Sequence, residues 1–101
     1  MLLAELIQIL SSIHPSKEIK YGFGKPHSWR GVYEDVAFEP VEDTTVGEML
    51  EHAKSALGTT FVGYKGGEFT MEEYTRCHIA EFGVYAEGSQ INTHMANYWK
   101  Y

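Results

Sequence analysis

The first residues of the chain place apolar side chains at helical spacing. Five of them recur three or four residues apart and share one helix face: Leu3, Leu6, Ile7, Leu10 and Ile13. Pro15 restricts the backbone of His14 and ends the pattern. The pattern therefore predicts an amphipathic helix over residues 2–13.

A second helix is predicted from its capping signals. Thr45 can accept from the exposed amides of a helix start, and Glu48, three residues later, can accept from the Thr45 amide. Gly58 provides a residue that readily adopts a left-handed conformation at a helix end. Apolar residues line one face between these signals: Val46, Met49, Leu50, Ala53 and Leu57. We predict a helix over Val46–Leu57.

The remaining regular patterns are typical of strands. In residues 32–39, Val32, Val36 and Phe38 share one strand face, with Glu34 the exception, and Pro40 ends the run. Residues 77–82 form another β-like run that can extend toward Tyr85. Residues 59–64 are rich in β-forming side chains, and Gly66-Gly67 predicts a tight turn that folds them back on residues 68–71.

Two segments lack a clear period. Residues 16–31 contain three glycines and a proline, which predicts a loop. The tail, residues 90–101, follows Glu87-Gly88-Ser89 and fits a strand or a short helix equally well. Because no repeat or linker divides the chain, we predict one α+β domain over residues 1–101, a small, mostly antiparallel sheet packed with two helices.

Composition narrows the class of protein. The chain has 101 residues, of which 44% are hydrophobic, enough for one packed core. Its single cysteine, Cys77, excludes an intramolecular disulfide, favours a reducing compartment and fits a small core residue. The apolar N-terminus contains Glu5 and has no basic residues before its apolar run. It therefore fits neither a signal peptide nor a membrane span. We therefore expect a cytoplasmic protein.

The charge is unevenly distributed along the chain. The net charge of −6 disfavours direct binding to nucleic acid or to an anionic membrane. Half of the eight basic residues fall in one stretch, namely Lys17, Lys20, Lys25 and Arg30. The segment from Glu34 to Glu51 holds seven acids and no base. This acidic run can imitate nucleic-acid phosphate and occupy a basic groove on a partner, or it can simply be a solvated face.

The segment from Tyr21 to Tyr33 is the strongest candidate site. Its side chains include donors for an anion, aromatic rings that can stack on a ligand, and glycines that let backbone amides approach. The candidate ligand-binding residues here are Lys25, His27, Ser28, Trp29, Arg30 and Tyr33, joined by Tyr64 and Lys65 at the second glycine-rich turn. The alternative is structural, with Trp29 filling the core, Arg30 paired with a carboxylate and Lys65 in a plain hairpin turn.

The sequence contains no catalytic or metal-binding constellation. The histidines are isolated, and Cys77 and His78 would point to opposite faces of a strand because they are adjacent. We therefore expect no metal site and no cofactor, and favour binding over catalysis.

Three phrases resemble small, functionally uncharacterised accessory proteins of bacteriophages and prophages. They are His27-Ser28-Trp29-Arg30-Gly31-Val32-Tyr33 with Ala37-Phe38-Glu39-Pro40, Thr45-Val46-Gly47-Glu48-Met49-Leu50, and Gly63-Tyr64-Lys65-Gly66-Gly67-Glu68-Phe69-Thr70-Met71, within residues 24–82. The resemblance assigns no role to any residue. It implies a short viral protein, made in the bacterial host cell, that acts by binding.

Two hypotheses follow. In the first, the protein is a homo-oligomeric, non-enzymatic binder of a small anionic, nucleotide-like ligand and sequesters a host defence signal. Trp29 would stack on a ring, while Arg30, Lys25 and Lys65 meet phosphates. A pocket deep enough would form most easily at a subunit interface. In the second, it is an acidic inhibitor that blocks a host defence protein through the nucleic-acid-like surface from Glu34 to Glu51.

Overall fold

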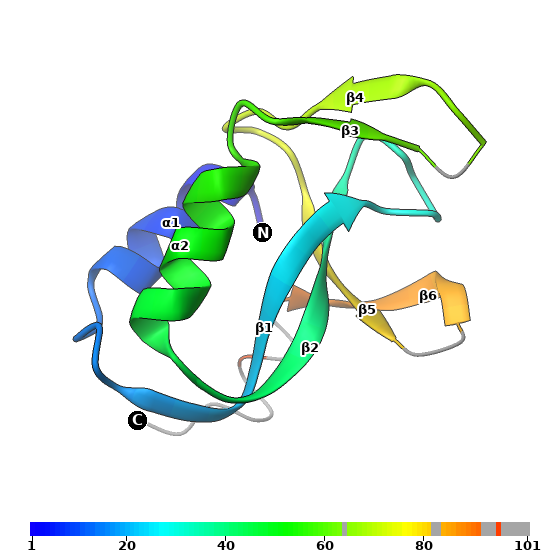
Figure 1. Ribbon diagram of the computed structural model, residues 1–101. Helices are drawn as coiled ribbons and strands as arrows, with labels where there is room; N and C mark the ends of the chain where they lie inside the picture. The colour runs from blue at the N-terminus through cyan, green and yellow to red at the C-terminus, as the bar shows by residue number, and fades with distance from the viewer. Residues whose placement is uncertain (64, 82–83, 92–94, 96–101) are drawn as a thin grey trace.

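The computed structural model describes residues 1–63, 65–81, 84–91 and 95, with the backbone alone described for residues 81 and 84–90 (Figure 1). Two helices and six strands occur in this part of the chain. The helices are α1 (Leu3–Ser11) and α2 (Val46–Ala56). The strands are β1 (Glu18–Ser28), β2 (Val36–Thr45), β3 (Thr60–Val62), β4 (Glu68–Thr70), β5 (Cys77–Glu81) and β6 (Val84–Gln90).

Four of the strands form one sheet in the order β1-β2-β5-β6. The outer pairs, β1 with β2 and β5 with β6, are antiparallel, whereas β2 and β5 run parallel. The other two strands, β3 and β4, form a separate antiparallel hairpin. The expected α+β fold with a mostly antiparallel sheet and two helices is therefore confirmed.

The core lies between the two helices and one face of the sheet, and α2 packs directly on β1 (Figure 1). Phe23 of β1 and Phe38 of β2 are fully buried, with ring centroids 5.1 Å apart. The apolar face predicted for the first helix is confirmed, because Leu3, Leu6 and Leu10 are completely buried. Burial of such side chains stabilises the fold by roughly 1.5–3 kcal/mol each.

The start of α2 follows the predicted cap with one difference. The Glu48 amide donates to Thr45 Oγ1 at 3.2 Å, as expected. The Glu48 carboxylate, however, accepts from the Thr44 hydroxyl at 2.6 Å and not from the Thr45 amide. Thr45 is the last residue of β2 and pairs with Glu18, so sheet and helix meet at this residue. At the other end, Gly58 has the expected left-handed backbone, with φ of +79°.

The loop predicted over residues 16–31 is wrong for residues 18–28, which form β1, and holds only for residues 16–17 and 29–31. The two glycines within β1, Gly22 and Gly24, serve close packing and not a turn. A Cβ on Gly22 would collide with Thr44 Cγ2 and lie 2.9 Å from Met49 Sδ. One on Gly24 would lie 3.0 Å from the His52 ring. The glycines therefore let α2 approach the strand, a role of glycine in strands that the sequence pattern did not reveal.

The boundaries of two other predicted segments also change. The strand predicted over residues 32–39 begins at Val36 and continues beyond Pro40 to Thr45, so residues 29–35 form the connecting loop. Glu87-Gly88-Ser89, predicted to separate the tail, lies inside β6. The predicted 59–71 hairpin is confirmed by β3 and β4, and the predicted strand from Cys77 is confirmed by β5 up to Glu81, while Tyr85 belongs to β6. Most of the 90–101 tail lies outside the described residues.

Within the described residues, no helix has the length and apolar character needed to cross a membrane.

The environment of Cys77 predicts a pH effect on stability. Burial raises the pKa of its thiol from 9.0 to about 12, an effect that the nearby N-terminal amine opposes and the charge of Asp35 reinforces. Below about pH 9 the thiol is neutral in both states. Above it, only the unfolded chain releases the proton, so stability falls as pH rises toward 12, by at most ~1.4 kcal/mol per pH unit.

Cys77→Ala removes this titration, so the difference in unfolding free energy between wild type and variant should shrink as pH rises above about 9. Urea titrations of both proteins from neutral to strongly alkaline pH measure it. Other ionisable groups cancel in the difference. Parallel stability curves would show that the thiol titrates equally in both states.

Candidate functional site

The loop at residues 29–35 is held by hydrogen bonds across its own ends. The Trp29 amide donates to the Asp35 carbonyl at 2.9 Å, and the Asp35 amide donates to the Val32 carbonyl at 2.9 Å. The buried Ser28 hydroxyl donates to the Tyr33 carbonyl at 2.5 Å. These hydrogen bonds close the loop into a compact turn and hold the side chains of Trp29 and Asp35 in place.

Trp29, His78 and Asp35 form a layered cluster that ties this loop to β5. The Trp29 indole stacks on the His78 imidazole, with ring centroids 3.8 Å apart and ring planes 19° apart. His78 Nε2–H donates to Asp35 Oδ2 at 2.9 Å. The His78 side chain is only 6% exposed and that of Asp35 15%. This contact holds the carboxylate in a fixed orientation, because a buried hydrogen bond resists rotation of either group.

Gly31 covers another part of the indole. A Cβ built on Gly31 would lie 2.7 Å from Trp29 Cζ2 and 2.9 Å from its Cε2 and Cη2. The indole is thus packed by the imidazole and by the Gly31 backbone. Stacking of Trp29 on a ligand ring would require displacement of one of these neighbours.

Two ring nitrogens of the cluster are buried without a hydrogen-bond partner in the part of the chain that the structure describes, namely Trp29 Nε1 and His78 Nδ1. An aspartate that orients a histidine is also found in hydrolases, where the second ring nitrogen faces the substrate. Here that nitrogen is buried under a stacked indole. The pair is therefore suited to holding Asp35 in place and poorly suited to proton transfer with an external substrate.

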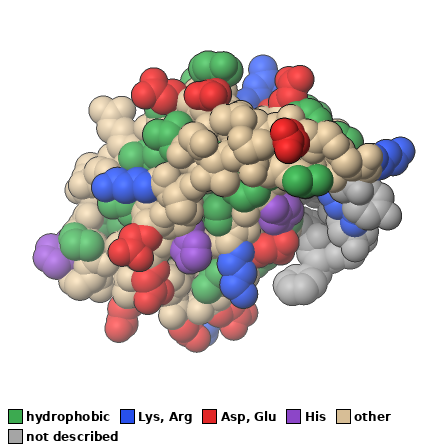
Figure 2. All heavy atoms as spheres, turned by 45° about the horizontal axis from the view of Figure 1, so that its top comes forward, with side chains coloured by type: hydrophobic (Ala, Val, Ile, Leu, Met, Phe, Trp, Pro, Cys, Tyr) green, Lys and Arg blue, Asp and Glu red, His purple; other side chains and the backbone are tan. Residues whose placement is uncertain are grey.

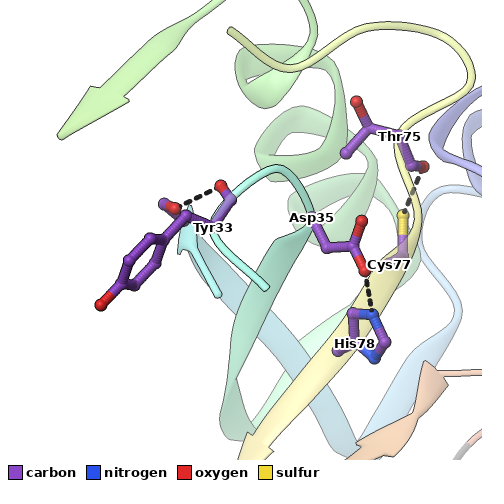
Figure 3. Close-up of polar contacts among 6 residues, drawn as sticks. Tyr33, Asp35, Thr75, Cys77 and His78 are labelled. Carbon is purple, nitrogen blue, oxygen red and sulfur yellow. Dashed lines mark hydrogen bonds and ion pairs between the residues drawn. The ribbon is translucent and has the colours of Figure 1, made fainter. Parts of the chain in front are cut away.

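A cleft of about 480 Å³ opens beside Asp35. It lies between the loop, the end of β4 and the segment that leads into β5, and its lining residues are Val32, Glu34, Asp35, Thr70, Glu72, Tyr74, Thr75 and Arg76. Figure 3 shows one oxygen of Asp35 bonded to His78 and the other turned away from the ring. That second oxygen makes no hydrogen bond to any described residue.

The cleft combines negative charge with exposed apolar surface. It holds three carboxylates against one guanidinium, that of Arg76. Tyr74 is 74% exposed and Val32 48%, both high for side chains of their type. Carboxylates beside an accessible aromatic ring favour a cationic ligand, because both attract positive charge.

A second cleft, of about 500 Å³, lies where β1 and β2 meet the start of α2. Helix starts often bind anions through their free amides. Here those amides have partners in the chain: Val46 donates to the Lys17 carbonyl at 3.0 Å and Gly47 to the Pro15 carbonyl at 2.9 Å. The start of α2 is therefore already satisfied by the protein.

The structure engages several of the predicted ligand-binding residues in contacts within the protein. Among the described residues, none of those predicted to bind a ligand lines either of the clefts described above. His27 bonds to Glu39 at 2.8 Å, and the Tyr33 ring packs on Phe69 with centroids 5.6 Å apart. Lys25 is exposed at an irregularity of β1, where its backbone φ is +48°.

Two further predicted residues, Arg30 and Lys65, lie at different places in the fold. Arg30 is half-buried, and Lys65 is exposed at the tip of the β3–β4 hairpin. Tyr64 lies outside the described residues.

Sequence reasoning missed the residues that build the cluster and the cleft, chiefly Asp35, Glu72, Tyr74, Arg76 and His78. One signal was present in the sequence. Cys77 and His78 point to opposite faces of β5, as predicted, because Cys77 lies in the core and His78 stacks on Trp29. A buried histidine on the face opposite the core requires a polar partner. The sequence did not identify Asp35 as that partner.

Three members of the acidic run make contacts in different parts of the fold. They engage separate partners, with Asp35 on His78, Glu39 on His27 and Glu48 on Thr44. On the face drawn in Figure 2, acidic side chains lie at several separate places with basic side chains between them. No group of three or more potential metal ligands occurs among the described residues.

Gly31→Ala should displace the indole of Trp29. The added methyl group would overlap the ring, so we expect a loss of roughly 1–3 kcal/mol in unfolding free energy and a red shift of tryptophan emission. Trp99→Phe is the background, because the chain has two tryptophans. Gly66→Ala is the matched control: its φ is +87° but no atom lies within 4 Å of its Cβ, so only stability should change. Unchanged emission in Gly31→Ala would disprove the packing.

Comparisons of this chain with protein-family models, with curated proteins and with solved structures found no match.

Proposed function

We propose that this chain is a non-enzymatic binding protein that captures a basic segment of a partner protein in the cleft beside Asp35. The observation that carries the proposal is the half-buried carboxylate of Asp35. His78 fixes one of its oxygens at 2.9 Å, while the other is unbonded within the described part of the chain. A carboxylate held this way binds a guanidinium or ammonium group without first losing rotational freedom.

The surroundings of Asp35 support a cation and oppose an anion. Glu34 and Glu72 add negative charge to the cleft, and the protein carries a net charge of −6. A positively charged partner would therefore be attracted over long distances as well as in contact. Arg76 can pair with an acidic residue at the edge of the partner, which would favour mixed basic segments over purely cationic ones.

The contacts of the predicted loop make the anionic-ligand hypothesis the weaker one. Ser28, His27 and Trp29 are engaged with Tyr33, Glu39 and His78. An anionic ligand would have to compete with these contacts. That hypothesis includes a homo-oligomer because its ligand pocket would form at a subunit interface. Binding at the cleft beside Asp35 does not require a second subunit.

The acidic surface in this proposal is smaller than the one in the acidic-inhibitor hypothesis. Only Glu34 and Asp35 of the acidic run line the cleft, and Glu72 joins them from outside the run. The resemblance to phage accessory proteins supports a role in the bacterial host, in which occupation of the cleft would block a basic site on a host protein.

Charge-neutral variants test the proposal. The probe is a fluorescent ~10-residue peptide that alternates arginine and threonine, titrated by anisotropy at low ionic strength. Glu34→Gln combined with Glu72→Gln should weaken its binding by about tenfold, which corresponds to ~1.4 kcal/mol. Both substitutions leave the bond between Asp35 and His78 intact.

Glu42→Gln combined with Glu51→Gln is the matched control, because it removes the same charge from exposed residues outside the cleft. Equal weakening by both pairs would mean that net charge alone drives binding. Calorimetry with cyclic and linear nucleotides tests the other hypothesis, and heat that disappears in Arg30→Ala would favour it.

A further inference from the structure

The register of the β3–β4 hairpin determines which backbone groups face outward. Gly63 N–H donates to the Gly67 carbonyl at 3.0 Å, and Met71 N–H donates to the Thr59 carbonyl at 3.0 Å. Hydrogen-bonded and non-hydrogen-bonded pairs alternate along antiparallel strands. The pairs of Thr60 with Thr70 and of Val62 with Glu68 are therefore the non-hydrogen-bonded ones.

In such pairs the N–H and C=O groups point away from the partner strand. Glu68 and Thr70 thus direct their backbone groups to the free edge of β4, and both residues are exposed. No backbone hydrogen bond joins these outward groups to another described residue. β3 contacts β1, while β4 is the outermost strand of the hairpin in Figure 1.

The free edge leads directly to the acidic cleft, because Thr70 is both the last residue of β4 and part of the cleft lining. A segment paired with the edge of β4 would pass beside Thr70 and continue along the cleft that Glu72 and Asp35 line. Because side chains two residues apart in a strand point to the same side, a basic side chain of that segment would reach these carboxylates.

We propose that the partner adds to the edge of β4 as an extended strand and places a basic side chain in the cleft, an inference that rests on the proposed function. Edge pairing supplies backbone hydrogen bonds that do not depend on sequence, and the cleft supplies selectivity for positive charge. Because β4 has only three residues, the edge contributes few hydrogen bonds, so binding requires both elements.

The negative charge beside the β4 edge favours a basic segment over a second copy of this chain as the occupant. If two β4 strands paired edge to edge, they would bring together two copies of the acidic residues at and beside that edge, Glu68 and Glu72. Like charges across neighbouring strands are destabilising. A basic extended segment has the opposite charge and meets no such penalty.

Proline substitutions test the edge. Thr70→Pro removes an outward N–H that the hairpin itself does not use. Thr60→Pro is the matched control, because Thr60 is the cross-strand neighbour, its N–H points outward from β3, and both variants lose the 2.7 Å hydroxyl contact between Thr60 and Thr70. We expect Thr70→Pro to weaken the arginine–threonine peptide by about tenfold and Thr60→Pro to leave it within about twofold of wild type.

A second measurement uses the unmodified protein, in case a proline variant does not fold. Two versions of the peptide carry backbone N-methyl groups on alternate residues, one set on each edge of the extended strand. Only one edge can pair with β4, so one version should lose binding and the other retain it. Equal affinities for the two versions would overturn the edge proposal.

The results of these experiments distinguish a failure of strand addition at β4 from a failure of binding at the cleft. If Glu34→Gln with Glu72→Gln weakens the peptide but Thr70→Pro matches Thr60→Pro, the cleft remains and strand addition is wrong. If wild type does not bind the peptide even at low ionic strength, both proposals fail. Peptide-independent dimers in sedimentation that Thr70→Pro abolishes would mean that a second copy occupies the edge.

Discussion

The hydrogen bond between Asp35 and His78 is the contact on which the site depends. It joins two residues 43 positions apart in the sequence and connects the loop before β2 to β5. Because Asp35 also accepts from the Trp29 amide through its carbonyl, the same residue closes the loop and faces the cleft. The stacked ring of Trp29 shields the bond from water, which strengthens it by lowering the local dielectric constant. Removal of either partner would leave a buried polar group unsatisfied.

The fold was largely predictable because its strongest signals are local. The apolar spacing of α1, the Thr45 cap of α2 and the Gly66-Gly67 turn each act within a few residues. The misassigned segment, β1, contains glycines whose purpose becomes clear only when α2 lies against them. Glycine in a strand and glycine in a loop look alike in one sequence, since what distinguishes them is a neighbour distant along the chain.

The site was less predictable for a related reason. Trp29 is prominent in the sequence, but its partner His78 lies on a strand far along the chain and is isolated from other histidines in the sequence. Its placement near an aspartate arises from the parallel pairing of β2 with β5, which sets Val36 opposite Cys77 and Ala37 opposite His78. The cleft likewise collects residues from three separate segments. Composition indicated an excess of acids but could not show which of them share a cavity.

The parallel pairing of β2 with β5 also affects how the protein folds. Antiparallel neighbours such as β1 and β2 or β3 and β4 can form from nearby segments, but parallel strands require the chain to cross over between them. Here the crossover contains α2 and the whole β3–β4 hairpin. Closing so long a loop is entropically costly, so we expect the β2–β5 contact to form after the local elements. The cluster of Trp29, Asp35 and His78 spans that contact, and binding at the cleft would therefore select chains whose folding is complete.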